Sequence, residues 1–308
     1  MSATTAASPA TVTTPELGSA LVTPRKSRTQ LQSIARALCQ RPIALVGLAI
    51  VIFWLVVGVL APVLPLQDID KQNMTARLQP PSAEHWLGTD ELGRDLFSRL
   101  IWGARVSVPA GIAVVVAACI VGGVLGALAG YLGGPVDTVI MRCSDAILAF
   151  PAIILAMTIT AVRGGPGLAN SLIAVGFVLW PEYARLMRSQ VLALRESEFV
   201  AAAESVGAGQ KRVLFRHILP STDAPIIVKV TLDVGAAIVL LAGLSYIGFG
   251  AIPPTPEWGA MTRLGADKGF QYWWYAFAPG VAIMSVVMGL NFFGDGLRDA
   301  LDPKRRGR

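Results

Sequence analysis

The chain alternates between long apolar runs and short polar segments, and this pattern predicts a membrane protein. A helical span needs about 20 apolar residues, and six windows of the chain meet that need. Together with breaks at Gly and Pro, they place the spans at about 43–64, 107–132, 138–162, 168–186, 222–250 and 274–293. We therefore expect an all-α membrane protein with six transmembrane helices.

Composition and charge agree with this prediction. Of all residues, 54% are hydrophobic and 15% are charged, whereas a soluble domain carries about a quarter charged residues. The net charge of +6 fits loops that face an anionic membrane surface. Nucleic-acid binding is the weaker interpretation, because the sequence has no basic stripe interleaved with aromatic residues. Most lysines and arginines lie at the two ends and between the fourth and fifth spans, so both termini are predicted to be cytosolic.

The pattern divides the chain into four parts. Residues 1–40 are rich in Thr, Ala, Ser and Pro over most of their length and are expected to form a disordered cytosolic tail. Residues 41–104 hold the first span and an extracytoplasmic segment, 105–299 hold the other five spans, and 300–308 form a basic cytosolic tail.

Two features of the outer side are predicted from local spacing. The apolar residues at 96, 97, 100 and 101 share one helical face. This favours an amphipathic helix ahead of the second span, which lies either in the membrane interface or against the exterior of the protein. The aromatic run at 272–275 predicts an interfacial belt ahead of the sixth span.

Charged residues within the predicted spans are candidate functional groups. Lys229 and Asp233 stand four apart in the fifth span, where a salt bridge is the first interpretation and a substrate or proton role the second. Arg142 and Asp145 in the third span could form an ion pair or be solvated. Phe150 and Pro151 in the same span indicate a kink.

The polar segment from Glu198 to Pro220 stands between two apolar runs, and its residues predict two short helices. Ser197 can cap the first helix, and Gly207 can end it in a left-handed turn. A second, basic helix would run from about Gln210 to Leu219, and Pro220 would end it. An ordinary amphipathic loop helix has the same features, so the pattern alone leaves the role of the segment open.

The same segment resembles the EAA loop of ABC-importer permeases, with Ala202, Ala203, Gly207, Leu219 and Pro220 at the family's spacing. Two positions depart from it, since Ala201 replaces the usual Glu and His217 the usual Ile. The resemblance implies coupling helices at about 197–220 that sit in a groove of an ATPase subunit. It assigns this contact to Ala201, Ala202, Ala203, Glu204, Gly207, Arg216, Leu219 and Pro220.

Three further stretches resemble the C-type permease subunits of dipeptide, oligopeptide and nickel importers. They read L-G-T-D-E-L-G-R-D at 87–95, L-S-Y-I-G-F-G-A-I-P-P-T-P-E-W-G at 244–259 and N-F-F-G-D-G-L-R-D-A-L-D-P at 291–303. The resemblance implies a type I ABC importer permease fold in a bacterial cytoplasmic membrane, working by alternating access. It also implies a second homologous permease, one or two cytosolic ABC ATPases and an extracytoplasmic solute-binding protein as partners.

Catalytic and metal-binding patterns are missing from the sequence. No phosphate-binding G-x-x-x-x-G-K-[ST] occurs, so ATP and Mg would be bound by partner ATPases, and we predict neither catalysis nor a cofactor in this subunit. The three cysteines have no metal-ligand spacing, and we predict no disulfide. Two other classes stay open: a proton-coupled secondary transporter that uses Lys229 and Asp233, and a membrane scaffold. Peptide, nickel and haem-like cargoes are not separated by the sequence.

Overall fold

The computed structural model describes residues 38–39 and 41–301, and regular structure within them is helical apart from one bridge between Thr89 and Asp95. The long helices are α2 (Pro42–Leu60), α3 (Leu96–Leu132), α4 (Gly134–Leu148), α5 (Ala152–Val162), α6 (Leu168–Arg195), α9 (Asp223–Ile247) and α11 (Trp273–Leu301). The short ones are η1 (Met74–Ala76), α7 (Glu198–Ser205), α8 (Gln210–Arg212), η2 (Val213–Ile218), η3 (Leu219–Ser221), α10 (Trp258–Ala266) and η4 (Phe270–Tyr272). The tails expected at 1–40 and 300–308 lie almost wholly outside the described residues.

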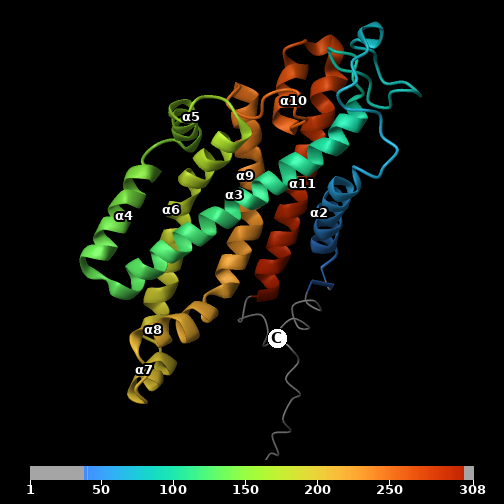
Figure 1. The fold of residues 1–308 in the computed structure, drawn as a ribbon. Coiled ribbons are helices and arrows are strands. Elements are labelled where there is room, and N and C mark those ends of the chain that lie inside the picture. The colour runs from blue at the N-terminus through green and yellow to red at the C-terminus, as the bar shows by residue number, and fades with distance from the viewer. Residues whose placement is uncertain (1–37, 40, 302–308) are drawn as a thin grey trace, which may run out of the picture.

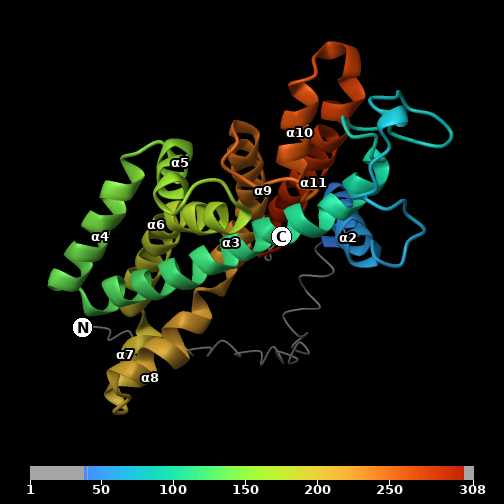
Figure 2. The same ribbon diagram turned by 45° about the horizontal axis from the view of Figure 1, so that its top comes forward.

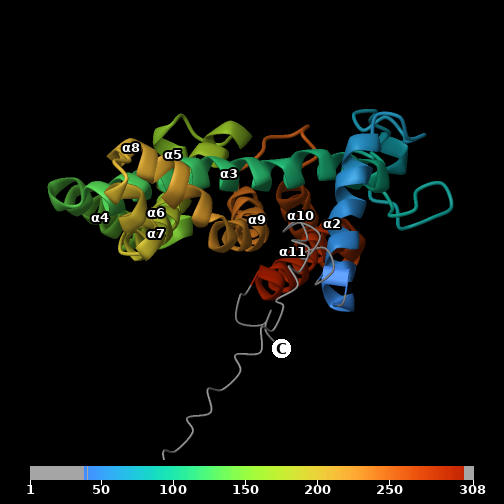
Figure 3. The same ribbon diagram turned by 90° about the horizontal axis from the view of Figure 1, so that it is seen from below.

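Helix α3 runs diagonally across the molecule and packs against α2, α4, α6, α9 and α11, while α5 packs against α6 and α9 (Figure 1). Seen from below, α5 lies on one side of α3, while α9, α10 and α11 lie on the other (Figure 3). Helices α7 and α8 lie at one end of the molecule, and α10 lies at the opposite end with the segment that precedes α3 (Figures 1 and 2). The molecule therefore has two polar ends joined by apolar helices.

Small residues hold α3 against α6. A Cβ added at Gly122 would lie 2.3 Å from the Trp180 carbonyl oxygen, and one added at Gly126 would lie 2.2 Å from the Ala184 carbonyl oxygen. Glycine lets two helix backbones approach closely, which is how helices associate in a bilayer where apolar burial between them adds little. The G-x-x-x-G spacing of the sequence thus becomes a tight crossing of α3 and α6.

The described residues contain four helices that are long and apolar enough to cross a membrane: α2, α3, α9 and the stretch that ends with α11. A fifth crossing is reached if α4 and α5 count as one broken span. Helix α6 has the length, but its second half carries charged residues, namely Glu182, Arg185, Arg188 and Arg195. Six spans with both termini in the cytosol therefore stay a prediction.

Two elements differ from the sequence-based prediction. The amphipathic helix expected ahead of the second span is the start of α3, because Leu96 begins a helix of 37 residues and is fully buried in the protein instead of lying in the membrane interface. The kink predicted at Phe150 and Pro151 is present, but it is sharp enough to divide the third span into two helices, α4 and α5, which meet at 97°. Pro151 lacks the N–H that would continue α4 and stands at the N-cap of α5.

The segment ahead of α3 folds through buried charges. Asp90 accepts hydrogen bonds from the Arg94 backbone N–H at 2.9 Å and the Arg94 Nε at 2.6 Å, and both side chains are buried. Asp95 caps α3 by accepting from the Ser98 N–H at 2.7 Å. Arg99 donates to the Pro254 carbonyl at 3.1 Å and so joins this segment to the loop before α10. The L-G-T-D-E-L-G-R-D stretch therefore builds a hydrogen-bonded cap at the start of α3, called the outer cap below because the sequence predicts that it lies outside.

The expected aromatic belt is only partly at the surface. Trp273 is 57% exposed, but Trp274 and Tyr275 are buried in the core that α11 shares with α3 and α10. The helical period explains the difference, because neighbouring residues of a helix point about 100° apart and only one side of α11 faces outward. The belt prediction is therefore wrong for Trp274 and Tyr275.

Candidate functional site

The 197–220 segment starts with a helix that lacks the expected side-chain cap. Ser197 stands at the N-cap of α7 with extended backbone angles. Its hydroxyl donates to the Leu194 carbonyl and so does not cap α7. The Ser197 carbonyl starts the helix by accepting from the Val200 N–H at 3.1 Å. Glu198 lies in the first turn as expected, where the helix dipole favours a carboxylate.

The end of α7 is a left-handed glycine turn, as predicted. Gly207 has a φ of +84°. Its N–H donates to the Glu204 carbonyl at 2.9 Å, and the next N–H, of Ala208, reaches back to the Ala203 carbonyl at 3.1 Å. These two bonds form a Schellman motif, which satisfies the last carbonyls of a helix and reverses the chain.

The second half of the segment is helical, but it is not the ordinary α-helix that was predicted. Helix α8 covers three residues, the turn then widens to a π-helix in η2, and a 3₁₀ turn, η3, follows. At the end of η2 the Leu219 N–H donates a hydrogen bond to the Leu214 carbonyl, five residues back. Pro220 gives the reason, because its ring would clash with the carbonyl four residues earlier in an α-helix. Pro220 thus lies inside the helical segment and does not end it.

One face of the segment is fixed to the long helices. Val200 of α7 and Val213 and Ile218 of η2 are buried in a second hydrophobic cluster. The partners that α3 and α6 supply to this cluster are Ala127, Met187 and Val191. Because the segment has no core of its own, this packing makes it a rigid extension of α3 and α6.

The other face of the segment is uncovered in this chain. The residues of the resemblance that lie on it are Ala201, Ala202, Glu204, Gly207, Arg216 and Pro220, while Ala203 and Leu219 are half-buried. Beside them Phe199 is 42% exposed, Phe215 67% and Val206 84%. Sequence reasoning missed these three apolar residues, although large apolar side chains in a polar segment were the signal for them.

Ion pairs join the foot of α6 to α4. Arg188 binds Asp137 through two bonds of 2.5 and 2.6 Å, and Arg185 binds Asp145 at 2.5 Å. The partner of Asp145 is therefore Arg185 and not Arg142, because the side chain of Asp145 points to a neighbouring helix instead of along its own. Two ion pairs thus join α6, on which the 197–220 segment packs, to α4 of the broken pair α4–α5.

A second candidate site lies between α6 and α9. Lys229 binds Asp233 at 2.9 Å, as the four-residue spacing predicted, and it also binds Glu182 of α6 at 2.7 Å. The Lys229 ammonium lies 5.2 Å from the centre of the Tyr183 ring. Sequence reasoning missed Glu182, although a carboxylate within a predicted span was the signal.

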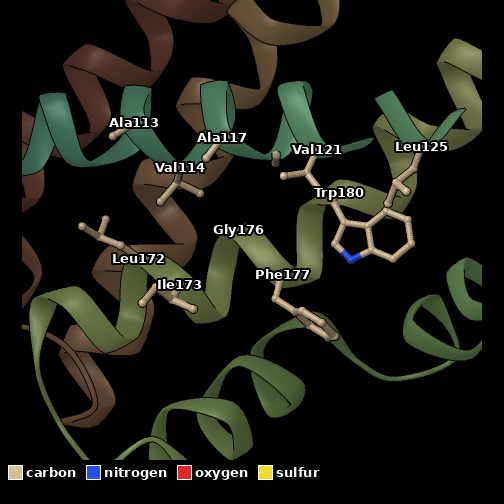
Figure 4. Close-up of a pocket in the computed structure, with 11 residues that line it drawn as sticks. Ala113, Val114, Ala117, Val121, Leu125, Leu172, Ile173, Gly176, Phe177 and Trp180 are labelled. Carbon is tan, nitrogen blue, oxygen red and sulfur yellow. The ribbon is translucent and has the colours of Figure 1, made fainter. Parts of the chain in front are cut away.

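An apolar hollow of about 470 Å³ lies between α3 and α6 (Figure 4). Its lining includes Val121 and Leu125 of α3 and Phe177 of α6, and it contains no charged side chain. Such a lining suits hydrocarbon and not a polar ligand, so the charged groups between α6 and α9 are the stronger candidate for recognition. Among the described residues, no group of three His, Cys, Asp or Glu side chains is placed to hold a metal ion.

Two family models match this chain. Residues 122–307 match a family model described as binding-protein-dependent transport system inner membrane component. The chain belongs to this family. Residues 29–81 also match the N-terminal transmembrane domain of oligopeptide transport permease C. The chain is thus a multi-pass protein of the inner membrane, and the 197–220 segment lies within the matched region.

Several relatives in the family align over most of their length. The dipeptide transport system permease protein DppC of Alkalihalophilus pseudofirmus is 46% identical, over 88% of this chain and 89% of its own. The di/tripeptide transport system permease protein DppC of Pseudomonas aeruginosa is 43% identical, over 85% and 88%. The glutathione transport system permease protein GsiD of Pectobacterium atrosepticum is 44% identical, over 77% of each chain.

Proposed function

We propose that this chain is a permease subunit of an ATP-driven importer of dipeptides and oligopeptides. Its fold supplies half of a path through the membrane, and a second homologous permease supplies the other half. One or two cytosolic ABC ATPases bind ATP and Mg and drive alternating access, while an extracytoplasmic solute-binding protein delivers the cargo. Family membership and the names of three relatives that carry peptides or glutathione support this proposal.

The observation that carries the mechanism is the form of the 197–220 segment. One face packs on the feet of α3 and α6, and the other is uncovered and holds small residues beside exposed apolar ones. A protein surface of this kind fits a groove on a partner. We infer that the ATPases bind this face on the cytosolic side, and that their closure tilts α3 and α6 as rigid bodies.

The test uses the whole importer, expressed with its second permease and ATPases and reconstituted with the solute-binding protein. Ala202→Asp places a charge in the middle of the uncovered face. We expect it to uncouple ATP hydrolysis from uptake of a labelled dipeptide while the subunit still inserts. Ala193→Asp is the matched control, since Ala193 is an exposed alanine of α6 outside the segment. Equal loss of coupling in both variants would contradict the proposed contact.

Two rival functions give different results in the same experiment. A proton-coupled secondary transporter would keep uptake without any ATPase and would lose it with Asp233→Asn. A membrane scaffold would show no uptake defect when the subunit is absent. Cargo is tested by competition, in which unlabelled dipeptide should block uptake and a nickel chelate or haem should not.

A further inference from the structure

The charges between α6 and α9 do not balance. One ammonium, Lys229, serves two carboxylates, Glu182 at 2.7 Å and Asp233 at 2.9 Å. The next cations along α6 are engaged elsewhere, because Arg185 and Arg188 each bind an aspartate of α4. The cluster of Glu182, Lys229 and Asp233 therefore carries one net negative charge.

The cluster is partly exposed on the surface of this chain. The side chain of Glu182 is 48% exposed, that of Lys229 23% and that of Asp233 19%. Charged side chains on membrane helices are costly against hydrocarbon and face water or other protein. We therefore take the shared face of α6 and α9 to line the water-filled path. Lys229 lies six residues after Asp223, so the cluster sits about 9 Å along α9 from the end near the 197–220 segment.

A buried hydroxyl at the same place lacks a partner. Tyr183 is 2% exposed, and its hydroxyl has no hydrogen bond among the described residues. The centre of its ring lies 5.2 Å from the Lys229 ammonium. The same ammonium contacts Asp233 Oδ2 at 2.9 Å, and this oxygen is also buried. Buried polar groups in proteins are usually paired. The cluster thus holds a buried tyrosine hydroxyl without a hydrogen bond beside two carboxylates that share a single ammonium.

We propose that Glu182, Lys229, Asp233 and Tyr183 form a binding site for an ammonium group in the translocation path, and that the amino terminus of a peptide binds there during its passage. An ammonium has three N–H donors, which the Asp233 oxygen, a Glu182 oxygen and the Tyr183 hydroxyl oxygen can accept. It also supplies the positive charge that the cluster lacks. The peptide part of this inference rests on the proposed function, whereas the cation site itself does not.

The chain contains a natural reporter for the site. Cys119 of α3 is half-buried and interacts electrostatically with Asp233 and Tyr183. We would label the complete importer in nanodiscs, with and without ATP, using a trimethylammonium methanethiosulfonate and its sulfonate counterpart. Modification of Cys119 is then followed by mass spectrometry. A net negative charge near the thiol should make labelling by the cationic reagent severalfold faster than labelling by the sulfonate, when each rate is divided by that of the same reagent with a neutral small thiol.

Conservative variants assign this preference to the cluster. We expect Glu182→Gln to remove it, and Asp137→Asn to keep it. Asp137 is the matched control, since it forms an ion pair between α4 and α6 away from the cluster. Equal rates for both reagents, or no labelling of Cys119 in either nucleotide state, would overturn the cation site. Loss of the preference in both variants would also overturn it, because the effect would then be a general disturbance of α6.

A second arm identifies the ammonium. An excess of alanyl-alanine should slow Cys119 labelling at least threefold, and its N-acetylated form should not. Potassium at the same concentration should have no effect, since a site that took any monovalent cation would respond to it. Equal protection by both peptides, or by potassium, would overturn assignment to the amino terminus. Peptide uptake is measured in parallel, so uptake without protection defeats only this inference, and absence of uptake defeats the proposed function.

Discussion

Replacing Gly207 by alanine isolates the backbone of the glycine turn. Gly207 has a φ of +84°, a conformation that residues with a Cβ rarely adopt. No atom lies within 4 Å of the position that a Cβ would take, so the substitution creates no steric contact with another residue. Within this chain, the effect of Gly207→Ala therefore comes from the turn, and the control variant tests whether an added methyl group itself disturbs the partner.

The size of this effect follows from the left-handed conformation. An L-residue held there costs about 1–2 kcal/mol, which corresponds to about a 5- to 30-fold change in an equilibrium constant. Gly209 gives the matched control, because its φ is −67° and its surroundings are also open. Alanine at 209 should be neutral or stabilise the segment by up to about 1 kcal/mol.

The assay measures binding of the ATPases to the permease pair in nanodiscs. We expect Gly207→Ala to weaken this binding about 5- to 30-fold, since the two-bond turn that sets the uncovered face would be less populated. Transport per ATP hydrolysed should fall in parallel. Gly209→Ala should change neither quantity.

Two results of the binding assay would contradict this prediction. If Gly207→Ala binds the ATPases as tightly as the parent, the left-handed turn does not set the docking surface. If Gly209→Ala weakens binding as much as Gly207→Ala, the segment is sensitive to any added methyl group, and the backbone argument fails.

Three further predictions concern stability. Gly126→Ala should lower the free energy of unfolding by about 1–3 kcal/mol, because its Cβ would meet the Ala184 carbonyl. The apparent melting temperature in detergent should therefore fall, and an unchanged value would refute the tight crossing. Asp90→Asn should lower the free energy of unfolding by about 3–5 kcal/mol, since it leaves the buried Arg94 charge without its partner. Limited proteolysis of the outer cap should become faster, and an unchanged rate would contradict this prediction. Burial raises the pKa of Glu257 above its usual 4.5 despite two backbone hydrogen bonds. The parent should therefore lose stability relative to Glu257→Gln as the pH rises from 4.5 through that raised pKa, and parallel melting curves across pH 4 to 7 would refute this.

The positions of most helices could be predicted from the sequence, since length, apolar content and breaks at Gly and Pro are local properties. The glycine turn at Gly207 and the pair of Lys229 with Asp233 were found for the same reason. A left-handed stop needs only a glycine at the right place, and a four-residue spacing on a helix brings two side chains together.

The tertiary structure decided which partner each group takes. Asp145 binds Arg185 instead of Arg142, and Lys229 gains Glu182, because helices far apart in sequence lie side by side. Spacing along one helix carries no information about its neighbours. For the same reason, the sequence could not show that Trp273 is exposed while Trp274 and Tyr275 are buried. The packing of α11 against α3 and α10 decides this.

The sequence by itself determined that this is a helical membrane protein with a polar segment between two apolar helices, because hydropathy and turn-forming residues act locally. Only the tertiary structure decided that this segment is packed on α3 and α6, and that three charges and a buried tyrosine converge between α6 and α9. Packing joins residues that are distant in the chain, and the free energy of such contacts depends on the whole arrangement of helices.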